Sequence, residues 1–446
     1  MQPRASAFSL ALGAGFLASA PAQAGNEDEF FLGSRAAMTA GAVVASVSDG
    51  SAAFNNPAGL ANAERSSIDV SASAYSIRVY RAPKFLSVDN GPTKDASVSE
   101  FLAIPTEFAY LRRLSEGISL GLGYFVPRSS DFVLRENLQA PEVGGVSNFG
   151  LNLRQSRTDY LFIAALGWRV ARVVRLGFGA SGALENQVDA AALFGAVTRG
   201  MAARKSLQSD EFSTTWAFGM ELSLGAQIEV TPQLTLGVAL RSPRLRVWQS
   251  VDGRSNTSAG SLEPGSEPGL ATASSNVNPD GHALAFVRAG RYIGGLALRL
   301  GAGMFHADVD MQPGLRDVAA GVDRRFTLNG RVGYSYEVSP HFSLGAGLFS
   351  DRATERKGFS LVGARGDFYG GTLGIELNNL HHLAPGEPAR SLQLSTVFAL
   401  RYARSDGTTT TLRAHPELPT QLLFEEANGK ITIHEIGLHV GSALYF

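Results

Sequence analysis

Residues 31–60 read FLGSRAAMTAGAVVASVSDGSAAFNNPAGL, and the rest of the chain is organised around this stretch. It is rich in Ala, Gly and Ser, is nearly uncharged, and ends in the sequence NNPAGL at positions 55–60. It carries no apolar stripe at helical spacing that is long enough to form a core of its own. Two interpretations are open: a surface arm or small capping segment, or a plug folded into the mouth of a hollow body. The remaining sequence distinguishes them.

Residues 1–24 have the form of a secretory signal peptide. Arg4 gives the positive start, residues 7–18 are apolar but too short to cross a bilayer as a helix, and Ala22-Gln23-Ala24 is a cleavage site with small residues. We therefore expect the mature chain to begin at Gly25. The alternative is an uncleaved anchor helix.

Composition limits the function of the mature chain. The 446 residues include no cysteine, so an exported protein of this length gains nothing from disulfides. The formal net charge of −1 offers no basic field for nucleic acid. After Ala24 no apolar run reaches the roughly 18 residues of a transmembrane helix. Backbone pairing and packing must therefore stabilise the fold.

Strict alternation of apolar with small or polar residues recurs along the body of the chain. In one example, Leu234, Leu236, Val238 and Leu240 alternate with Thr235, Gly237, Ala239 and Arg241. Successive side chains of a strand point to opposite faces, so one face of each segment is apolar. The pattern predicts fourteen strands, near 67–80, 106–113, 117–126, 158–169, 174–184, 213–229, 233–242, 282–290, 291–305, 324–337, 341–350, 366–378, 391–403 and 431–446.

The connections between these segments separate a membrane barrel from a soluble sandwich. Short turns, such as those near residues 115–117 and 231–233, alternate with long connections, such as 185–212 and 243–281. Tight periplasmic turns and long extracellular loops are typical of outer-membrane barrels. The exception is 379–390, which is long although it falls on the periplasmic side. The sequence predicts an all-β, transmembrane, antiparallel up-and-down barrel of 14 strands over residues 67–446, with residues 25–66 as an N-terminal hatch in its lumen.

The end of the chain supports this prediction, because the last strand finishes with the aromatic Phe446 on its lipid face. A terminal Phe of this kind is the usual assembly signal of outer-membrane barrels, so we expect the barrel assembly machinery, outer-membrane lipid and lipopolysaccharide as partners. A plugged barrel needs no trimer, and we expect a monomer.

The inferred inner face is heavy in glycine, which costs strand stability and therefore needs a reason. Either the N-terminal segment or a bound ligand approaches the wall closely, or glycine merely permits the barrel to coil. The residues concerned are Gly121, Gly123, Gly177, Gly179, Gly219, Gly225, Gly237, Gly301, Gly303, Gly345, Gly347 and Gly437.

At this point the sequence resembles a family. The run DGSAAFNNPAGL at 49–60, directly before a first strand, resembles the hatch of the FadL/TodX-type transporters of long-chain fatty acids and aromatic hydrocarbons. The closest match is the triplet Asn56, Pro57 and Ala58. LGLGYFVP at 120–127 is similar to the family's third strand, and LGVALRSP at 236–243 is similar to another of its strands.

The resemblance implies a bacterial outer-membrane channel for passive uptake of hydrophobic compounds, with long-chain fatty acids first among them, gated by the hatch. It implies gating residues Asn55, Asn56, Pro57, Ala58 and Gly59, and a bend of the third strand that opens the wall. The bend would involve Gly121, Gly123 and Pro127. The alternative is a general-diffusion or structural barrel without fatty-acid selectivity.

Two further sets of residues are candidate ligand contacts. Apolar residues at roughly helical spacing in the 185–212 connection predict one wall of an external groove or, equally, a loop helix packed on the barrel rim: Leu193, Phe194, Val197 and Met201. Inward-facing arginines are candidates for a fatty carboxylate, or else for structural pairing with Glu221, Glu376 or Glu435: Arg241, Arg299, Arg331 and Arg401.

Sequence motifs of catalysis are absent: there is no P-loop, HExxH, GxSxG or cysteine site, and we expect no enzyme activity, cofactor or metal. His306, Asp308 and Asp310 alternate in what the pattern predicts to be an external loop. A divalent ion at these three side chains is the alternative that the residue types leave open.

Overall fold

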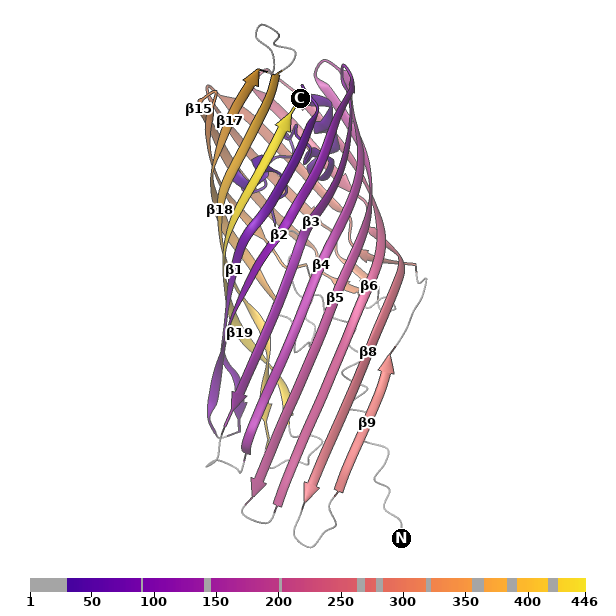
Figure 1. The fold of residues 1–446 in the computed structure, drawn as a ribbon, viewed down its shortest axis with the longest axis vertical. Coiled ribbons are helices and arrows are strands. Elements are labelled where there is room, and N and C mark those ends of the chain that lie inside the picture. The colour runs from indigo at the N-terminus through magenta and orange to yellow at the C-terminus, as the bar shows by residue number, and fades with distance from the viewer. Residues whose placement is uncertain are drawn as a thin grey trace.

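The computed structural model describes residues 30–89, 91–139, 146–199, 203–262, 269–277, 284–317, 322–354, 365–382, 391–415 and 424–446. The predicted signal peptide lies outside these residues. Within them the chain forms a closed antiparallel barrel that holds a short helical segment in its lumen (Figure 1). The lumen elements are α2 (Ser34–Met38), α3 (Ala52–Asn55) and the 3₁₀ helix η1 (Pro57–Asn62).

The strands follow in chain order: β1 (Ser67–Val88), β2 (Thr93–Ser115), β3 (Ile118–Leu138), β4 (Val146–Ala171), β5 (Val174–Arg199), β6 (Ala203–Glu229), β7 (Leu234–Arg241), β8 (Arg244–Leu262), β9 (Gly269–Val277), β10 (Ala285–Arg288), β11 (Arg291–Leu300), β12 (Gly303–Gln312), β13 (Leu315–Asp317), β14 (Val322–Arg324), β15 (Thr327–Ser339), β16 (Phe342–Asp351), β17 (Arg365–His382), β18 (Ser391–Ala414) and β19 (Phe424–Tyr445).

Strand pairing closes the ring through the β19–β1 seam, where the antiparallel register begins at Tyr445↔Ser67. β7 and β8 lie end to end along β6, and β11 and β10 lie end to end along β7 and β8. Each of these two pairs therefore occupies one barrel position. β9 pairs with β8 beyond β10, so it shares the barrel position of β10 and β11. With the β13–β14 hairpin outside the ring, the described strands occupy fourteen positions, which confirms the predicted count.

The segmentation behind that count was wrong in one place. Residues 282–290 and 291–305 do not form two neighbouring strands with a turn at Gly290, because β10 and β11 share one position. The hairpin turn lies instead at Gly301, whose φ of 64° suits glycine. His306, Asp308 and Asp310 are consequently not in an external loop: they lie on β12, and each is at most 3% exposed.

The predicted long connections are largely strand. β4, β5 and β6 contain 26, 26 and 27 residues, although a tilted strand crosses a bilayer in about 9–11. They extend far beyond the hatch at one end of the barrel (Figure 1). We call this the long-strand end, and the opposite end, with the 116–117 and 172–173 turns and the C terminus, the short-turn end.

The outer surface carries an apolar belt. On β6 the outward side chains of Trp216, Met220, Leu222, Leu224 and Ile228 are 41–52% exposed. A continuous exposed apolar band of this kind is the lipid-facing surface of a barrel. No helix in the described ranges is both long and apolar enough to cross a membrane. Phe446 is 48% exposed and its amide donates to the Ser66 carbonyl at 3.0 Å, while its part in assembly stays a prediction.

Candidate functional site

The hatch segment, defined here as residues 30–66, sits on the glycines of the barrel wall. A Cβ added to Gly177 would lie 2.1 Å from the Pro57 carbonyl carbon, and one on Gly225 would lie 2.0 Å from Asn56 Oδ1. One on Gly347 would lie 2.6 Å from the Thr39 carbonyl carbon. Real Cβ contacts are never this short, so only glycine admits the hatch backbone. The absence of a side chain at these inner-face glycines therefore allows the N-terminal segment to pack directly on the wall. We call these glycines the glycine seat of the hatch.

Other inner-face glycines have different neighbours. A Cβ on Gly219 would meet Arg244, a side chain of the barrel itself. The prediction that Gly301 and Gly303 face the lumen was wrong: Gly301 lies in a hairpin turn, and Gly303 shares the outward face of β12 with Val309 and Met311, where a Cβ would meet the Tyr334 hydroxyl. Only some of these glycines therefore contact the hatch. Others make room for large side chains on neighbouring strands.

The predicted gating residues lie together at the centre of the seat. Asn56 is fully buried; its Nδ2 donates to the Val44 carbonyl at 2.7 Å and to the Ala226 carbonyl of β6 at 3.2 Å. Its Oδ1 accepts from the Ala58 amide at 3.1 Å, which caps η1, and Pro57 fills the first helical position. One side chain thus fixes a helix start and joins it to the wall.

Asn55 and Gly59 hold the hatch segment to itself. Asn55 Nδ2 donates to the Leu32 carbonyl at 2.9 Å and to the Ser51 carbonyl at 3.2 Å. A Cβ on Gly59 would lie 2.2 Å from the Val47 carbonyl oxygen. These contacts make the five predicted residues a structural unit; their part in gating remains a prediction.

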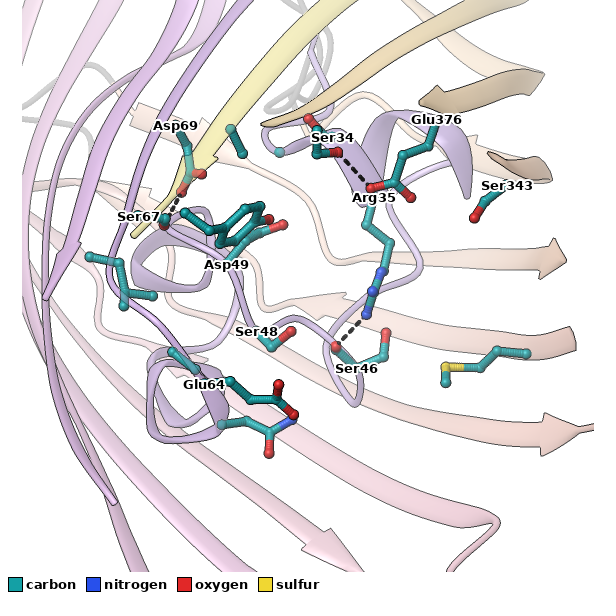
Figure 2. A pocket seen from close by; sticks show the side chains of 18 of the residues that line it. Ser34, Arg35, Ser46, Ser48, Asp49, Glu64, Ser67, Asp69, Ser343 and Glu376 are labelled. Carbon is teal, nitrogen blue, oxygen red and sulfur yellow. Dashed lines mark hydrogen bonds between the residues drawn. The ribbon is translucent and has the colours of Figure 1, made fainter. Parts of the chain in front are cut away.

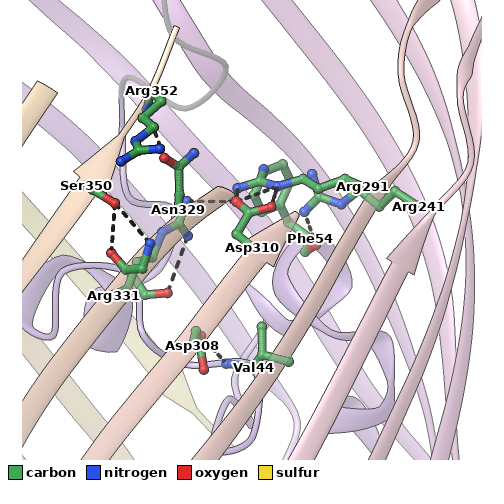
Figure 3. A network of polar contacts seen from close by, with 12 residues as sticks. Val44, Phe54, Arg241, Arg291, Asp308, Asp310, Asn329, Arg331, Ser350 and Arg352 are labelled. Carbon is green, nitrogen blue, oxygen red and sulfur yellow. Dashed lines mark hydrogen bonds and ion pairs between the residues drawn. The ribbon is translucent and has the colours of Figure 1, made fainter. Parts of the chain in front are cut away.

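Polar side chains of β7, β12 and β15 hold the opposite side of the hatch (Figure 3). Asp308 Oδ2 accepts from the amides of Val43 and Val44 at 2.8 and 3.0 Å. Arg241 donates to the Phe54 carbonyl at 2.5 Å and lies over the Phe54 ring at 3.9 Å. The hatch is therefore held through its backbone by a buried carboxylate and a half-buried guanidinium of the barrel wall.

Further arginines of the barrel wall lie beside these contacts and pair with carboxylates. Asp310 accepts from Arg291 at 2.9 Å and from Arg331 at 3.5 Å. Glu435 of β19 pairs with Arg78 at 2.8 Å and with Arg401 at 3.0 Å. The structural pairing that the sequence offered for Arg401 is therefore present.

A second buried network lies on β4, β5, β6 and β8. Arg157 pairs with Asp159 at 3.2 Å and with Glu185 at 3.5 Å. Arg244, 1% exposed, pairs with Glu185 and with Glu221. Together these groups form what we call the arginine belt, which consists of Arg78, Arg157, Arg241, Arg244, Arg291, Arg331 and Arg401. Carboxylates that pair with these arginines in the described residues include Asp159, Glu185, Glu221, Asp310 and Glu435.

Beyond the belt, towards the long-strand end, the buried side chains are mainly apolar, with a few polar ones such as Gln187 and Thr411 among them. On β4 the inward side chains change from Leu161 beside the hatch, through Arg157, to Leu153 and Phe149. The same order recurs on β1, where Arg78 precedes the buried side chains of Ala82, Phe85, Leu86 and Val88. The outer apolar cluster contains Ala82, Phe85, Leu86, Val88, Ala96, Val98, Leu134, Leu138, Phe149, Leu151, Leu153, Leu193, Leu412, Ala414, Ile431 and Ile433.

The wall is irregular between β2 and β3. Their backbone pairing stops at Glu107↔Phe125, although in the described residues both strands continue for more than ten residues beyond. The β3–β4 register also shifts between Phe125 and Arg128, next to the predicted bend at Pro127. The Pro127 carbonyl accepts from the Phe30 amide of the hatch at 3.2 Å. Gly121 faces Leu60 of the hatch, and Gly123 lies against the Phe125 ring.

A polar cavity of about 650 Å³ lies between the hatch and the short-turn end (Figure 2). We call it the vestibule. Arg35, Ser46, Asp49, Asp69 and Glu376 line it. Charged and hydroxyl groups on all sides make it a poor path for an apolar molecule.

Several predicted ligand residues lie elsewhere than expected. Arg299 lines the vestibule and is exposed, apart from the arginine belt. The 185–199 stretch is β5 and not a helix, so Leu193 points into the outer apolar cluster while Phe194 points away from it. These two side chains cannot form one wall of a groove. Val197 lies on the same strand, and Met201 lies outside the described residues.

Several solved structures share this architecture. The structure of a Pseudomonas aeruginosa FadL homologue matches with a TM-score of 0.58 and 12% identity over 94% of this chain and 99% of that one. A TodX deltaS2S3 mutant, described as a monoaromatic hydrocarbon channel, matches with a TM-score of 0.56 and 14% identity over 94% and 100%. The P. putida toluene transporter TodX matches with a TM-score of 0.52 and 12% identity over 93% and 98%.

The chain has the FadL/TodX fold. No family model matches the sequence, and no curated protein matches it either. At these identities the FadL/TodX likeness establishes the barrel with its lumen segment, and it confirms the predicted fold class. Three belt residues, Arg241, Arg331 and Arg401, were among the inward-facing arginines named from the sequence. The other four were missed, although a charged residue at an inward position of a strand, such as Arg78, was a visible signal.

Proposed function

We propose that the chain is a passive channel in a bacterial outer membrane that takes up hydrophobic compounds, with long-chain fatty acids as its substrate class. The observation that carries the proposal is the order of layers along the lumen: outer apolar cluster, arginine belt, hatch. An acyl chain of about fifteen methylenes gains roughly 12 kcal/mol on leaving water, at about 0.8 kcal/mol each. The apolar layer suits such a chain, and the belt suits the carboxylate at its end.

The same order of layers favours an exit of the substrate sideways, through the barrel wall. Below the belt the hatch fills the lumen, and below the hatch lies the polar vestibule. An apolar molecule loses its hydrophobic gain in a cavity lined by charged groups. The interrupted β2–β3 pairing beside Pro127 offers a route through the wall into the bilayer. In this proposal a shift of the hatch at 55–59 opens that route.

Substrate pairs that differ only in charge test the proposal without altering the protein. The mature chain is reconstituted in liposomes, and uptake of labelled oleate, methyl oleate and toluene is compared. The arginine belt predicts that oleate enters fastest, because only oleate carries a carboxylate. Equal rates for oleate and its neutral ester would show that the arginine belt does not recognise the carboxylate. Transport of toluene alone would show that the substrates are aromatic hydrocarbons and not fatty acids.

A variant that lacks residues 31–60 tests the alternative function, a general-diffusion barrel. A general-diffusion barrel already passes small sugars in its complete form. We expect the complete chain to exclude sugars, because the hatch packs against the wall on glycine, and the deletion variant to admit them.

A further inference from the structure

Gly437 of β19 is an inner-face glycine whose surroundings differ from those of the glycine seat. Among the described residues beyond its chain neighbours, the one atom within 4 Å of a Cβ on Gly437 would be Arg401 Cβ, at 3.9 Å. No hatch backbone therefore rests on this glycine, and its missing side chain leaves space. A cavity of about 30 Å³ lies there, and the hatch residues Phe30 and Phe31 line it together with Gly437.

Two polar side chains that line this cavity have no hydrogen-bond partner among the described residues. Ser76 of β1 is 3% exposed, and His439 of β19 is 6% exposed. The unpartnered atoms are Ser76 Oγ and both ring nitrogens of His439. Nearly all buried polar groups of native proteins form hydrogen bonds, either to protein or to ordered water. A partner from outside the chain is therefore expected between these two side chains.

The pairing of the barrel wall is interrupted at the same place. β1 and β19 close the barrel, and they lie side by side in Figure 1. Between the pairs Ala72↔Val440 and Ser76↔Gly437, three residues of β1 face two residues of β19. His439 is one of those two. Such a bulge leaves part of the backbone ladder unpaired, so the two unpartnered side chains lie where the closing seam has lost backbone hydrogen bonds.

The size and the polar groups of the cavity fit water. A buried water requires about 10–15 Å³ of volume, so 30 Å³ admits about two waters. A neutral imidazole offers one donor and one acceptor, and a serine hydroxyl offers both functions. Water can satisfy each of these groups, whereas an apolar atom satisfies none. Arg401 and Glu435 also line the cavity and pair with each other at 3.0 Å, which gives a water further polar neighbours.

We propose that ordered water in this cavity bridges Ser76 of β1 and His439 of β19, and so completes the closing seam of the barrel where its backbone ladder is interrupted. Gly437 supplies the space for the water, because any side chain at this inward position would occupy it. Phe30 and Phe31 cover the water from the lumen side. The bridge joins the first strand to the last strand, and it does not depend on what the protein transports.

X-ray radiolysis in H₂¹⁸O detects such a water in the unaltered mature chain, purified in detergent. Radicals formed from a bound water oxidise the side chain beside it, even where bulk solvent does not reach. We expect mass spectrometry to show ¹⁸O in His439 several-fold faster than in His306. His306 is the matched control, because it is 1% exposed and its ring nitrogens lie 3.0 Å from Ser46 Oγ and 3.3 Å from Ser335 Oγ.

A variant that fills the cavity sharpens this measurement. Gly437→Ala places a methyl group in the space of the water without a steric clash, so labelling of His439 should fall several-fold. The matched control is Gly330→Ala, since a Cβ on Gly330 meets nothing within 4 Å, and it should leave the labelling unchanged. Labelling of His439 no faster than that of His306 in the unaltered protein would overturn the water site. Full labelling in Gly437→Ala would also overturn it.

Melting temperatures give a second, independent test. In a dry cavity Ser76→Ala would remove a buried hydroxyl that has no partner, and the melting temperature would rise. With a bridging water the same change removes a partner of that water, and we expect a fall of about 1–3 °C. The double variant Ser76→Ala with His439→Leu should melt no lower than His439→Leu alone, because both changes act on the same water. A rise in Ser76→Ala, or losses that add in the double variant, would overturn the bridge.

Discussion

The two halves of the lumen are filled in different ways. At the short-turn end the hatch backbone rests on glycines of the wall, with contacts that leave no room for a Cβ. At the long-strand end, buried Leu, Phe, Ile and Val side chains from distant strands meet one another. Backbone on glycine fixes one geometry, whereas side chains change rotamer and make room. We therefore expect the hatch to be rigid and the outer apolar cluster, where an apolar ligand would first arrive, to adapt its side chains.

The largest effect is expected from filling the glycine seat. Gly225→Leu must displace Asn56 and Pro57, because even a Cβ would lie 2.0 Å from Asn56 Oδ1. We expect the hatch to leave its seat, so that the barrel conducts ions in planar bilayers and melts at a much lower temperature. The control is Gly330→Leu, since a Cβ on Gly330 meets nothing within 4 Å. If Gly225→Leu stays closed and melts like the unaltered protein, the hatch is not held by the glycine seat.

A cavity in the outer half should be the next largest change. Phe149→Ala removes a fully buried ring from the outer apolar cluster and should cost about 3–5 kcal/mol of unfolding free energy. Phe162 on the same strand is 55% exposed on the lipid face, so Phe162→Ala should cost far less. Equilibrium unfolding in urea compares the two. Equal losses would mean that the outer half is not a packed core.

Alternation predicted the barrel well because side-chain direction in a strand depends only on local geometry. Trp216 and Leu236 face outwards as the pattern required, and both are over 40% exposed. The glycine face predicted that something approaches the wall, and at Gly177 it is the hatch.

Strand ends and side-chain partners could not be obtained in this way. The residues around Gly290 carry a turn signal, yet β10 and β11 continue one position because β8 and β7 already lie end to end beside them. The spacing around Leu193 suits a helix as well as a strand, and pairing with Ser209 of β6 decides for a strand. Long-range pairing also brought Arg78 to Glu435, across 357 positions of sequence.

A smaller effect is expected at the side-chain contact that holds the hatch backbone. Asp308→Ala leaves the amides of Val43 and Val44 buried without their acceptor, which should cost about 1–3 kcal/mol. Hydrogen exchange at these two amides should accelerate, while the outer apolar cluster stays protected. Asp308→Asn keeps a carbonyl acceptor and should restore most of the protection. If exchange is unchanged in Asp308→Ala, the hatch half is rigid through its glycine seat alone.

The smallest effect concerns the polar side of the outer half. Glu211 lies on β6 five residues beyond Trp216, outside the lipid-facing band, and burial raises its pKa from 4.5 to about 7, with the Glu426 carboxylate adding to the shift. The folded state therefore holds the proton more tightly than the unfolded state. This contribution to stability is complete below pH 4.5 and is lost as the pH rises through about 7.

Glu211→Gln removes that dependence because a neutral amide replaces the carboxyl group. The variant should melt one or a few degrees above the unaltered protein at pH 8, and the two should converge near pH 4.5, where the carboxyl group is protonated. Melting curves at four or five pH values give the comparison. A constant difference at every pH would assign the effect to packing of the amide. A difference that grows from acid to alkaline pH would show that the outer half contains a charged group in an otherwise apolar filling, in contrast to the backbone-filled half at the hatch.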